Sequence, residues 1–302
     1  MFIRMGKLTI KTCPICESEQ LEPSLTCVDH FTTGEMFCIN VCRNCGFMLT
    51  QNAPDEEEIG HYYETNDYVS HTDTRKGLIH RIYHLARRFM LWRKSLLIEN
   101  LTHKKIGRIL DYGAGTGYFA NAMKQRGWDV RAIEPNRSAR EFAAANFKIN
   151  IRSPKAIKTL RKGSYDVITL WHVLEHIHDL NKIMEQFNSL LSEKGLLIIA
   201  VPNHTGYDAG HYGALWAAYD VPRHLWHFSP SNIQQLGAKH GFILAERHTM
   251  PLDAFYVSML TEKQMHHSLA FLRGLFVGLI AFFNTMAHKD KSSSLIYVFR
   301  KK

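Results

Sequence analysis

From position 106 onward, short runs of β-branched and aromatic residues alternate with stretches in which apolar positions recur every three or four residues. The first pattern is typical of buried strands, and the second is typical of helices that pack on a sheet. Their regular alternation predicts an α/β domain with a mainly parallel sheet that helices cover on both faces. We expect strands at 108–111, 129–133, 149–151, 165–170, 196–201, 242–248 and 295–300, and helices that begin near Tyr118, Ser138 and Leu180.

A longer helical pattern precedes this domain. Apolar residues recur at helical spacing from Leu78 to Leu96, and basic residues such as Arg88 and Lys94 occupy the remaining face. The pattern predicts a basic amphipathic helix. We expect it to pack on the following domain, and contact with a membrane surface or an acidic partner is the alternative.

A strongly apolar stretch lies within an insertion at 251–294, between the last two expected strands. Residues 268–287 approach the length of a membrane span. Arg273 lies inside the stretch, however, and a strand pattern resumes at Leu295, so a spanning helix would pull the last strand from its sheet. We predict a helical lid over the acceptor site or a dimer contact, with peripheral membrane contact through 268–287 as the alternative.

The N-terminal region carries two pairs of cysteines. Cys13 and Cys16 form the first pair, Cys42 and Cys45 form the second, and 25 residues separate the pairs. This spacing is typical of a tetrahedral four-thiolate zinc site. Four protein ligands leave no open coordination position, so the expected Zn²⁺ is structural. We therefore expect a zinc-ribbon-like module at 1–60, a tyrosine-rich segment with the amphipathic helix at 61–105, and the α/β domain at 106–302.

The net charge of +9 raises the question of nucleic-acid binding. Residues 1–60 hold four Lys and Arg residues against nine Asp and Glu residues, so the cysteine-bearing region is acidic. The positive excess is spread along the remaining chain, which is more typical of a solvated surface than of a nucleic-acid footprint, and we expect no nucleic-acid partner. The N-terminus lacks the pattern of a secretory signal, so we expect a cytoplasmic protein with reduced thiols.

A glycine-rich turn follows the first expected strand of the α/β domain. Gly113, Gly115 and Gly117 precede a helix that opens with Tyr118. Glycine lets the backbone approach a ligand closely, and a helix N-terminus offers unpaired N–H groups. The GxGxxG fingerprint of nicotinamide and flavin proteins fails, because Tyr118 occupies the position of its last glycine. Glu134, at the end of the next strand, is spaced to accept hydrogen bonds from both ribose hydroxyls, so the pattern indicates a nucleoside-containing cofactor.

Residues 109–117, Glu134 and residues 165–176 together resemble the successive motifs of class I S-adenosylmethionine-dependent methyltransferases. The resemblance covers about residues 106–250, and it implies a Rossmann-like sheet of seven strands whose last strand is antiparallel. It also implies that the glycine turn wraps the methionine part of the cofactor, that Glu134 holds the ribose, and that residues 171 and 172 lie beside the sulfonium. The cofactor-binding residues expected on this basis are Asp111, Gly113, Ala114, Gly115, Gly117, Tyr118, Phe119, Glu134, Pro135, Trp171 and His172.

Histidines supply the candidate catalytic residues. An acceptor hydroxyl, phenol or carbon acid has to lose a proton, and imidazole has a pKa suited to accept it. His224 and His227 follow the fifth strand, at the edge of the sheet where ligands bind, so we predict one of them as general base, with His172 as a third candidate. A hydrogen-bonded structural role is the alternative for each. Glu175 and His176 are adjacent on an expected helix and should point in different directions, so we expect packing or capping there.

The cysteine pairs and the segment 220–229 also resemble a subgroup that includes zinc-containing deoxysugar C-methyltransferases, which carry a longer C-terminal domain than this chain has. The sequence thus predicts an enzyme that methylates oxygen or carbon of a small or amphipathic molecule such as a sugar, a quinone or a lipid-linked acceptor. The alternative is a zinc-ribbon RNA-binding protein or an RNA methyltransferase.

Overall fold

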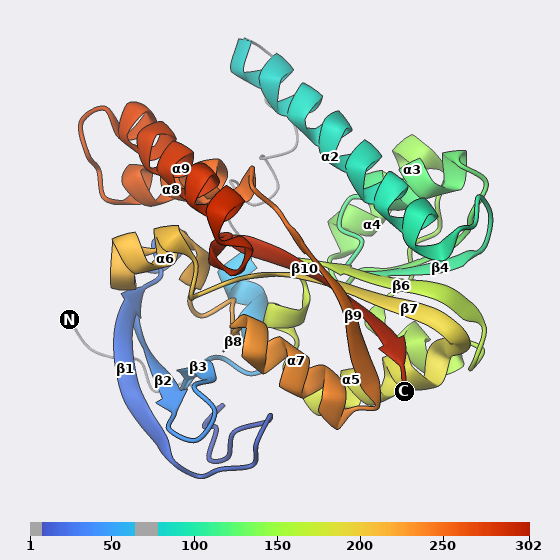
Figure 1. Ribbon diagram of the computed structural model, residues 1–302, viewed down its shortest axis with the longest axis horizontal. Coiled ribbons are helices and arrows are strands. Elements are labelled where there is room, and N and C mark those ends of the chain that lie inside the picture. The colour runs from blue at the N-terminus through green and yellow to red at the C-terminus, as the bar shows by residue number, and fades with distance from the viewer. Residues whose placement is uncertain (1–7, 64–77) are drawn as a thin grey trace.

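A computed structural model of the chain describes residues 8–63 and 78–302 (Figure 1). Its larger sheet has six strands in the order β5-β4-β6-β7-β10-β9. These strands are β4 (Arg108–Tyr112), β5 (Asp129–Ile133), β6 (Tyr165–Trp171), β7 (Leu191–Pro202), β9 (Phe242–Thr249) and β10 (Ser294–Lys301). β4 to β7 are parallel, and β10 pairs antiparallel with both β7 and β9. The expected α/β architecture and its antiparallel last strand are confirmed.

The expectation of a seventh strand at 149–151 is wrong. In the described part of the chain, the adjoining Arg152 makes a single bridge to Ile133. Its N–H donates to the carbonyl of Ala132, and its carbonyl accepts from the N–H of Glu134, both at 2.9 Å. Pro154 follows two residues later, lacks an N–H and begins the 3-10 turn Pro154–Thr159, so the extended segment ends before a ladder forms.

Helices cover both faces of the large sheet. Consecutive strand residues such as Val167 and Ile168 point to opposite faces, and they lie in separate apolar clusters. Val167 is buried with Phe119, and Ile168 is buried with Phe187. The first face is covered by α2 (Leu78–Thr102) and α3 (Tyr118–Gln125), the second by α5 (Leu180–Leu190) and α7 (Pro230–Lys239), and α4 (Arg137–Phe147) packs near β5.

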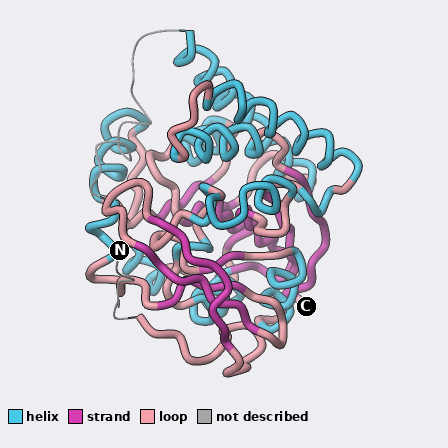
Figure 2. The backbone as a smooth tube through the Cα atoms, turned by 90° about the vertical axis from the view of Figure 1, so that its left-hand side faces the viewer, coloured by secondary structure: helices cyan, strands magenta, loops and turns pink. Residues whose placement is uncertain are grey.

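A second sheet contains the N-terminal strands (Figure 2). Its order is β1-β2-β3-β8, where β1 is Leu21–Val28, β2 is Met36–Cys42, β3 is Met48–Gln51 and β8 is Trp226–His227. β8 thus comes from a distant part of the chain and pairs antiparallel with β3. Phe47 packs against Trp226 and Phe228, with ring centroids 6.0 and 5.4 Å apart. The cysteine-bearing region and the segment around position 224 are therefore joined by one sheet and one apolar cluster.

The predicted helical insertion consists of α8 (Asp253–Gln264) and α9 (Ala270–Ala287), which lie side by side (Figure 1). The two helices approach closely because Gly274 and Gly278 face α8. A Cβ at these positions would lie 2.5 Å from Met259 Cα and 2.8 Å from Phe255 Cα. Among the described residues, α9 is the one helix long and apolar enough to cross a membrane. The remaining short elements are α6 (Tyr207–Tyr212) and the 3-10 turns Ile59–Tyr63, Leu174–His176, Gly213–Leu215, Ala217–Tyr219 and Lys289–Lys291.

Candidate functional site

The glycine turn lies between β4 and α3, at the carboxyl edge of the parallel strands. Gly113, Gly115 and Gly117 have φ angles of 77°, 53° and 82°, which side chains rarely adopt. A Cβ on Gly113 would lie 2.3 Å from Val173 Cγ2, whereas a Cβ on Gly115 would meet no atom of the described residues within 4 Å. Packing therefore requires glycine at 113, and position 115 borders open space in which a ligand can lie.

Glu134 faces this turn from the end of β5. Its carboxylate accepts hydrogen bonds from the N–H groups of Gly115 and Asn136, each at 2.8 Å. The residue is 8% exposed, and burial raises its pKa although both N–H donors oppose that shift. A carboxylate beside an open glycine turn retains lone pairs for the two ribose hydroxyls of S-adenosylmethionine. The residues present thus fit this cofactor.

The other expected cofactor residues surround the turn. Asp111 accepts a hydrogen bond from Thr169 Oγ1 at 2.9 Å, and burial raises its pKa to about 7. The rings of Phe119 and Trp171 meet edge to face, with centroids 5.4 Å apart. The ring of Tyr118 contacts the guanidinium of an α2 arginine at 4.4 Å. Ala114 donates its N–H to the carbonyl of Ile133, and Pro135 is exposed.

Two charged residues that the sequence analysis did not select lie at the same place. Lys94 of α2 places its Nζ 4.3 Å from the ring centroid of Trp171. Burial lowers the pKa of Lys94 to about 8, although Asp253 and Asp111 oppose the shift. The periodicity of the helix predicted a basic face, but it could not indicate that Lys94 turns toward β6. Asp253 lies at the start of the insertion, where no motif marks it.

His172 follows β6 and has a φ of 56°. Its Nε2 lies 3.2 Å from Asp253 Oδ2, and its Nδ1 lies 3.6 Å from Glu175 Oε1. Burial by itself lowers the pKa of His172, but the two carboxylates outweigh burial and raise the pKa to about 9. At neutral pH His172 is therefore mostly imidazolium, which can donate a proton and cannot accept one.

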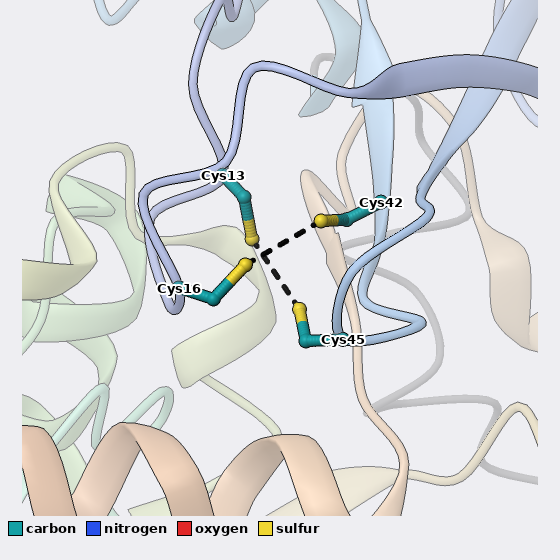
Figure 3. A group of neighbouring side chains, drawn as sticks. All are labelled: Cys13, Cys16, Cys42 and Cys45. Carbon is teal, nitrogen blue, oxygen red and sulfur yellow. Dashed lines mark hydrogen bonds between the residues drawn. The ribbon is translucent and has the colours of Figure 1, made fainter.

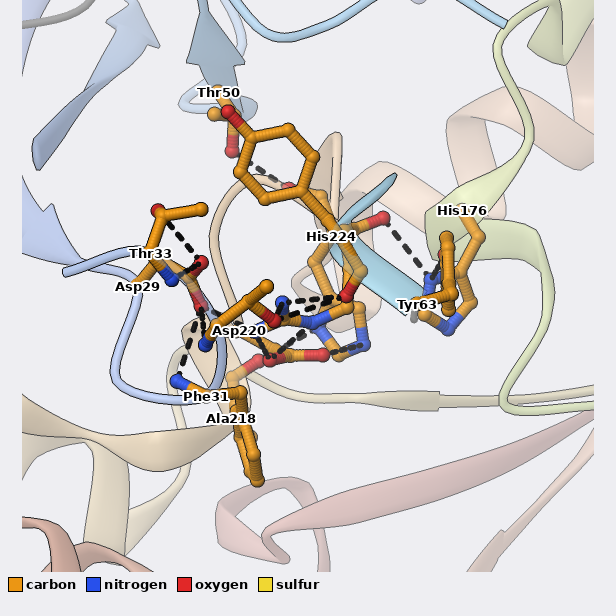
Figure 4. A network of polar contacts seen from close by, with 12 residues as sticks. Asp29, Phe31, Thr33, Thr50, Tyr63, His176, Ala218, Asp220 and His224 are labelled. Atoms are coloured by element: carbon orange, nitrogen blue, oxygen red, sulfur yellow. Dashed lines mark hydrogen bonds and ion pairs between the residues drawn. The ribbon is translucent and has the colours of Figure 1, made fainter. Parts of the chain in front are cut away.

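Glu175, His176 and His224 form a second cluster, and Figure 4 shows the two histidines side by side. The cluster brings one ligand atom from each residue within 4.8 Å of the others. The two imidazole centroids are 4.5 Å apart. Both carboxylate oxygens of Glu175 are buried and have no hydrogen-bond partner among the described residues. Glu175 and His176 share the cluster because they lie in the 3-10 turn Leu174–His176, where we had expected an α-helix.

Backbone carbonyls fix the protonation of these two imidazoles. Nδ1 of His224 lies 2.8 Å from the carbonyl oxygen of Ala218, and Nδ1 of His176 lies 3.0 Å from that of Arg223. The hydroxyl of Tyr63 is also 3.0 Å from Nδ1 of His176. Since a carbonyl only accepts, each Nδ1 carries a proton, and Nε2 is the ring nitrogen left for other partners. Tyr68, which belongs to the same predicted tyrosine-rich segment, lies outside the described residues.

The charges of the cluster follow from burial. Burial and, after it, His224 lower the pKa of His176 to about 4, so this ring is neutral near pH 7. Burial opposes ionisation of Glu175, but His172, His176 and His224 outweigh it and lower its pKa. The neutral imidazole of His176 and a carboxylate can accept a proton from a bound molecule, and the donor set of the whole cluster can hold a divalent cation.

His227 lies in the junction between the two sheets, away from this cluster. Its Nε2 is 3.0 Å from Thr50 Oγ1, and the residue is 4% exposed. Burial lowers its pKa well below the usual value. Thr50 Oγ1 also donates to the carbonyl of His224 at 2.7 Å. These contacts place His227 as a link between β3 and the loop that carries His224.

The guanidinium of Arg223 forms a further link between the N-terminal region and this loop. Its Nη2 lies 2.9 Å from Asp29 Oδ1 and 2.6 Å from Asp220 Oδ1, and its Nη1 donates to the carbonyl of Tyr62 at 3.1 Å. Arg223 is 2% exposed. Because both carboxylates are held by one buried cation, the Asp29 turn fixes the backbone next to His224.

The four predicted zinc ligands lie together (Figure 3). The Sγ atoms of Cys13 and Cys45 are 3.6 Å apart, those of Cys16 and Cys42 are 3.5 Å apart, and all four lie within 4.8 Å of one another. A tetrahedron with Zn–S bonds near 2.3 Å has sulfur separations of about 3.8 Å. The geometry and the thiolate chemistry of the four residues therefore fit a zinc ion.

Comparisons with known proteins agree with this site. The family model described as "Methyltransferase domain" matches residues 81–246. The ubiquinone biosynthesis O-methyltransferase of Rickettsia bellii (strain OSU 85-389) is 24% identical over 188 residues, which cover 57% of this chain and 77% of that protein. The protein of the same name from Caulobacter sp. (strain K31) is 30% identical over 105 residues, covering 32% of this chain and 42% of that protein.

A solved structure from Galdieria sulphuraria, assigned as a sarcosine dimethylglycine methyltransferase, has a similar fold. It superposes with a TM-score of 0.50 at 17% identity, covering 74% of this chain and 88% of that one. The family match spans more than half of the chain and contains the glycine turn, Glu134, His172 and His224. The chain therefore belongs to the methyltransferase domain family and is a class I S-adenosylmethionine-dependent methyltransferase.

Proposed function

We propose that this enzyme methylates an oxygen or an acidic carbon of a small or amphipathic acceptor, with His224 as general base. The observation that carries the proposal is the pair of neighbouring imidazoles, His176 and His224, beside the buried carboxylate of Glu175. This cluster follows β6, and the cofactor turn follows the adjacent parallel strand β4, so both lie at one edge of the sheet. S-adenosylmethionine supplies an activated methyl group, so the protein has to align the acceptor and remove its proton.

The residues divide the proton chemistry between them. In this proposal Nε2 of His224 receives the acceptor's proton, because its Nδ1 is committed to the carbonyl of Ala218. The Glu175 carboxylate then stabilises the imidazolium, as the acid does in a catalytic triad. His172, held as a cation between Asp253 and Glu175, cannot serve as base near pH 7.

A phenol-type hydroxyl is the acceptor that suits this base best. A phenol has a pKa of about 10, so an imidazole can remove its proton at modest cost, whereas an aliphatic hydroxyl is far less acidic. Relatives that are named ubiquinone biosynthesis O-methyltransferase support the same class. The resemblance of the cysteine-bearing region to deoxysugar C-methyltransferases supports a sugar acceptor instead.

The test replaces His224 by Asn and measures methyl transfer from labelled S-adenosylmethionine, first into a fractionated cell extract and then into simple phenols and sugars. We expect a loss of about 10²- to 10⁴-fold in rate with unchanged cofactor affinity by calorimetry. His240→Asn is the matched control, because His240 is half-buried at the C-terminal end of α7 and bonds to Asn181. A His224→Asn enzyme with full activity would exclude His224 as base, and a Gly115→Leu enzyme that binds the cofactor normally would contradict the assigned turn.

We further propose that Cys13, Cys16, Cys42 and Cys45 hold one structural zinc ion. The ion would brace β2 and the knuckle at 42–45, whose Cys45 carbonyl accepts a hydrogen bond from Asn232 of α7 at 2.9 Å. Metal analysis should give about one zinc per chain. Cys42→Ser should lose the metal, whereas Cys27→Ser, equally buried outside the cluster, should keep it. Full zinc content in Cys42→Ser would overturn the assignment.

A further inference from the structure

The outer face of α9 is the largest group of exposed apolar side chains on one described element. Eight large apolar side chains on α9 and its N-cap are between 41% and 70% exposed. They are Leu269, Phe271, Leu272, Leu275, Phe276, Leu279, Phe283 and Met286, and we call them the α9 face. Soluble proteins rarely expose apolar patches of this extent without a partner.

The packing of α9 is the reverse of that of an ordinary amphipathic helix. Its buried side consists of small or medium residues that face α8, namely Gly274, Val277, Gly278, Ala281 and Thr285. Only 28% of the segment Ala270–Ala287 is buried, and the mean hydropathy of this segment is 1.6. A core helix buries its large apolar residues, whereas α9 presents them outward. The chain therefore keeps an apolar surface exposed that its own fold does not cover.

Charged groups at both ends of α9 are cationic. Arg273, in the first turns, is the single charged residue within the helix and pairs with Glu262 of α8 at 3.0 Å. Beyond the other end, Lys289 and Lys291 line an open cleft of about 1080 Å³. Arg247 also lines this cleft and pairs with its one acidic residue, Asp290, at 3.0 Å. An apolar face with cations at its ends is the pattern of a helix that lies in the interface of an anionic bilayer.

A second helix has the same character. Leu85, Phe89 and Trp92 of α2 lie on one face and are 69%, 44% and 51% exposed. Exposed arginines flank this face, and the guanidinium of Arg93 lies 5.9 Å from the ring centroid of Phe89. Apolar side chains with flanking arginines suit the boundary between acyl chains and headgroups.

We infer that the α9 face docks this enzyme on an anionic lipid bilayer, with α9 lying in the plane of the interface. A spanning orientation conflicts with the fold, because α8 follows β9 and α9 leads into β10, and these two strands pair with each other over seven residue pairs. A lipid surface explains the cationic ends better than a second copy of the chain does. Antiparallel pairing of two α9 helices would place Lys289 and Lys291 of one copy near Arg273 of the other, which Glu262 already neutralises, so a second copy would offer these lysines no opposite charge there.

The membrane contact has a consequence for the site. The helix hairpin that carries the α9 face begins at Asp253, whose Oδ2 lies 3.2 Å from Nε2 of His172. Docking through this hairpin would therefore bring the bilayer surface to the helix pair that contacts the candidate site through Asp253. The inference stands independently of the proposed acceptor, because it rests on exposure and charge outside the glycine turn.

The experiment measures sedimentation of the full chain with vesicles of phosphatidylcholine alone and with vesicles that also contain phosphatidylglycerol. We expect binding to the anionic vesicles and a roughly tenfold or greater loss of binding in the double variant Phe276→Asp and Phe283→Asp. The matched control is the double variant Ile106→Asp and Ile243→Asp, whose side chains are 69% and 53% exposed elsewhere on the molecule. Calorimetry with S-adenosylmethionine checks that every variant is folded.

A charge arm tests the cationic end. Lys289→Gln with Lys291→Gln should weaken binding to anionic vesicles by about 30-fold, because each lysine near such a surface contributes about 1 kcal/mol. Lys158→Gln with Lys162→Gln, two exposed lysines in and just after the 3-10 turn Pro154–Thr159, should leave binding unchanged. Absence of wild-type binding to anionic vesicles overturns the inference. The inference is also overturned if light scattering shows a dimer that becomes a monomer in the Phe276→Asp and Phe283→Asp variant, while lipid has no effect on the oligomeric state.

Discussion

Gly113 and Gly115 should respond differently to the same substitution, although they lie two residues apart in one turn. Alanine at either position is forced into a left-handed backbone conformation, which costs about 1 kcal/mol. At position 115 the new methyl group enters open space, because the described residues leave 4 Å free around it. At position 113 it would lie 2.3 and 2.6 Å from the two γ-carbons of Val173.

The overlap at position 113 sets the magnitude. Overpacking of this kind typically costs a further 1–3 kcal/mol or so. We therefore expect Gly113→Ala to lower the free energy of unfolding by about 2–4 kcal/mol, against about 1 kcal/mol for Gly115→Ala. Gly115→Ala should instead weaken binding of S-adenosylmethionine, because its methyl group occupies the open space beside the turn in which the cofactor is expected to lie.

Urea unfolding gives the stability change, and calorimetry gives the cofactor affinity. The decisive variant is Gly113→Ala combined with Val173→Ala, which removes both γ-carbons. If the overlap with Val173 causes the loss, the double variant should recover about 1–3 kcal/mol relative to the sum of the single variants. Additive effects would refute the reasoning, and so would equal stability losses at positions 113 and 115.

Further predictions concern the charged groups. Asp253→Asn should lower the pKa of His172 from about 9 toward its ordinary value, as imidazole NMR signals would show. Since the folded-state pKa is raised, the stabilising effect of Asp253 is fully present below pH 6.5 and is lost as pH rises through 9, so the variant and wild type should converge in stability at high pH. Arg223→Gln leaves the buried carboxylates of Asp29 and Asp220 without their cation and should cost about 3–5 kcal/mol in unfolding experiments. The matched change Arg126→Gln, at a partly exposed pair with Glu99, should cost about 1 kcal/mol or less, and equal losses would contradict the role of burial.

The sequence by itself determined the features that depend on neighbouring residues. The large-sheet strands β4, β5, β6, β7, β9 and β10, the glycine turn and the spacing of Glu134 follow from local periodicity and backbone requirements. The two cysteine pairs indicated their own cluster because each pair places two thiols on one tight turn. The strand expected at 149–151 is absent, although the apolar residues around position 150 indicated one. Pro154 begins a 3-10 turn two residues after the single bridge of Arg152, so the extended segment is too short for a ladder.

The tertiary structure alone decided which histidine meets which acid. His176 and His224 are 48 positions apart, and they lie together because β8 pairs with β3 and Arg223 binds Asp29. The same assembly places His227 against Thr50 and away from the cluster. Lys94 reaches Trp171 and Asp253 reaches His172, each from a different helix. The periodicity of a helix fixes its apolar face but not the partner of a single side chain. Local pattern thus defined the cofactor side of the site, and long-range packing defined its proton chemistry, because side chains from distant segments meet only when the sheets are assembled.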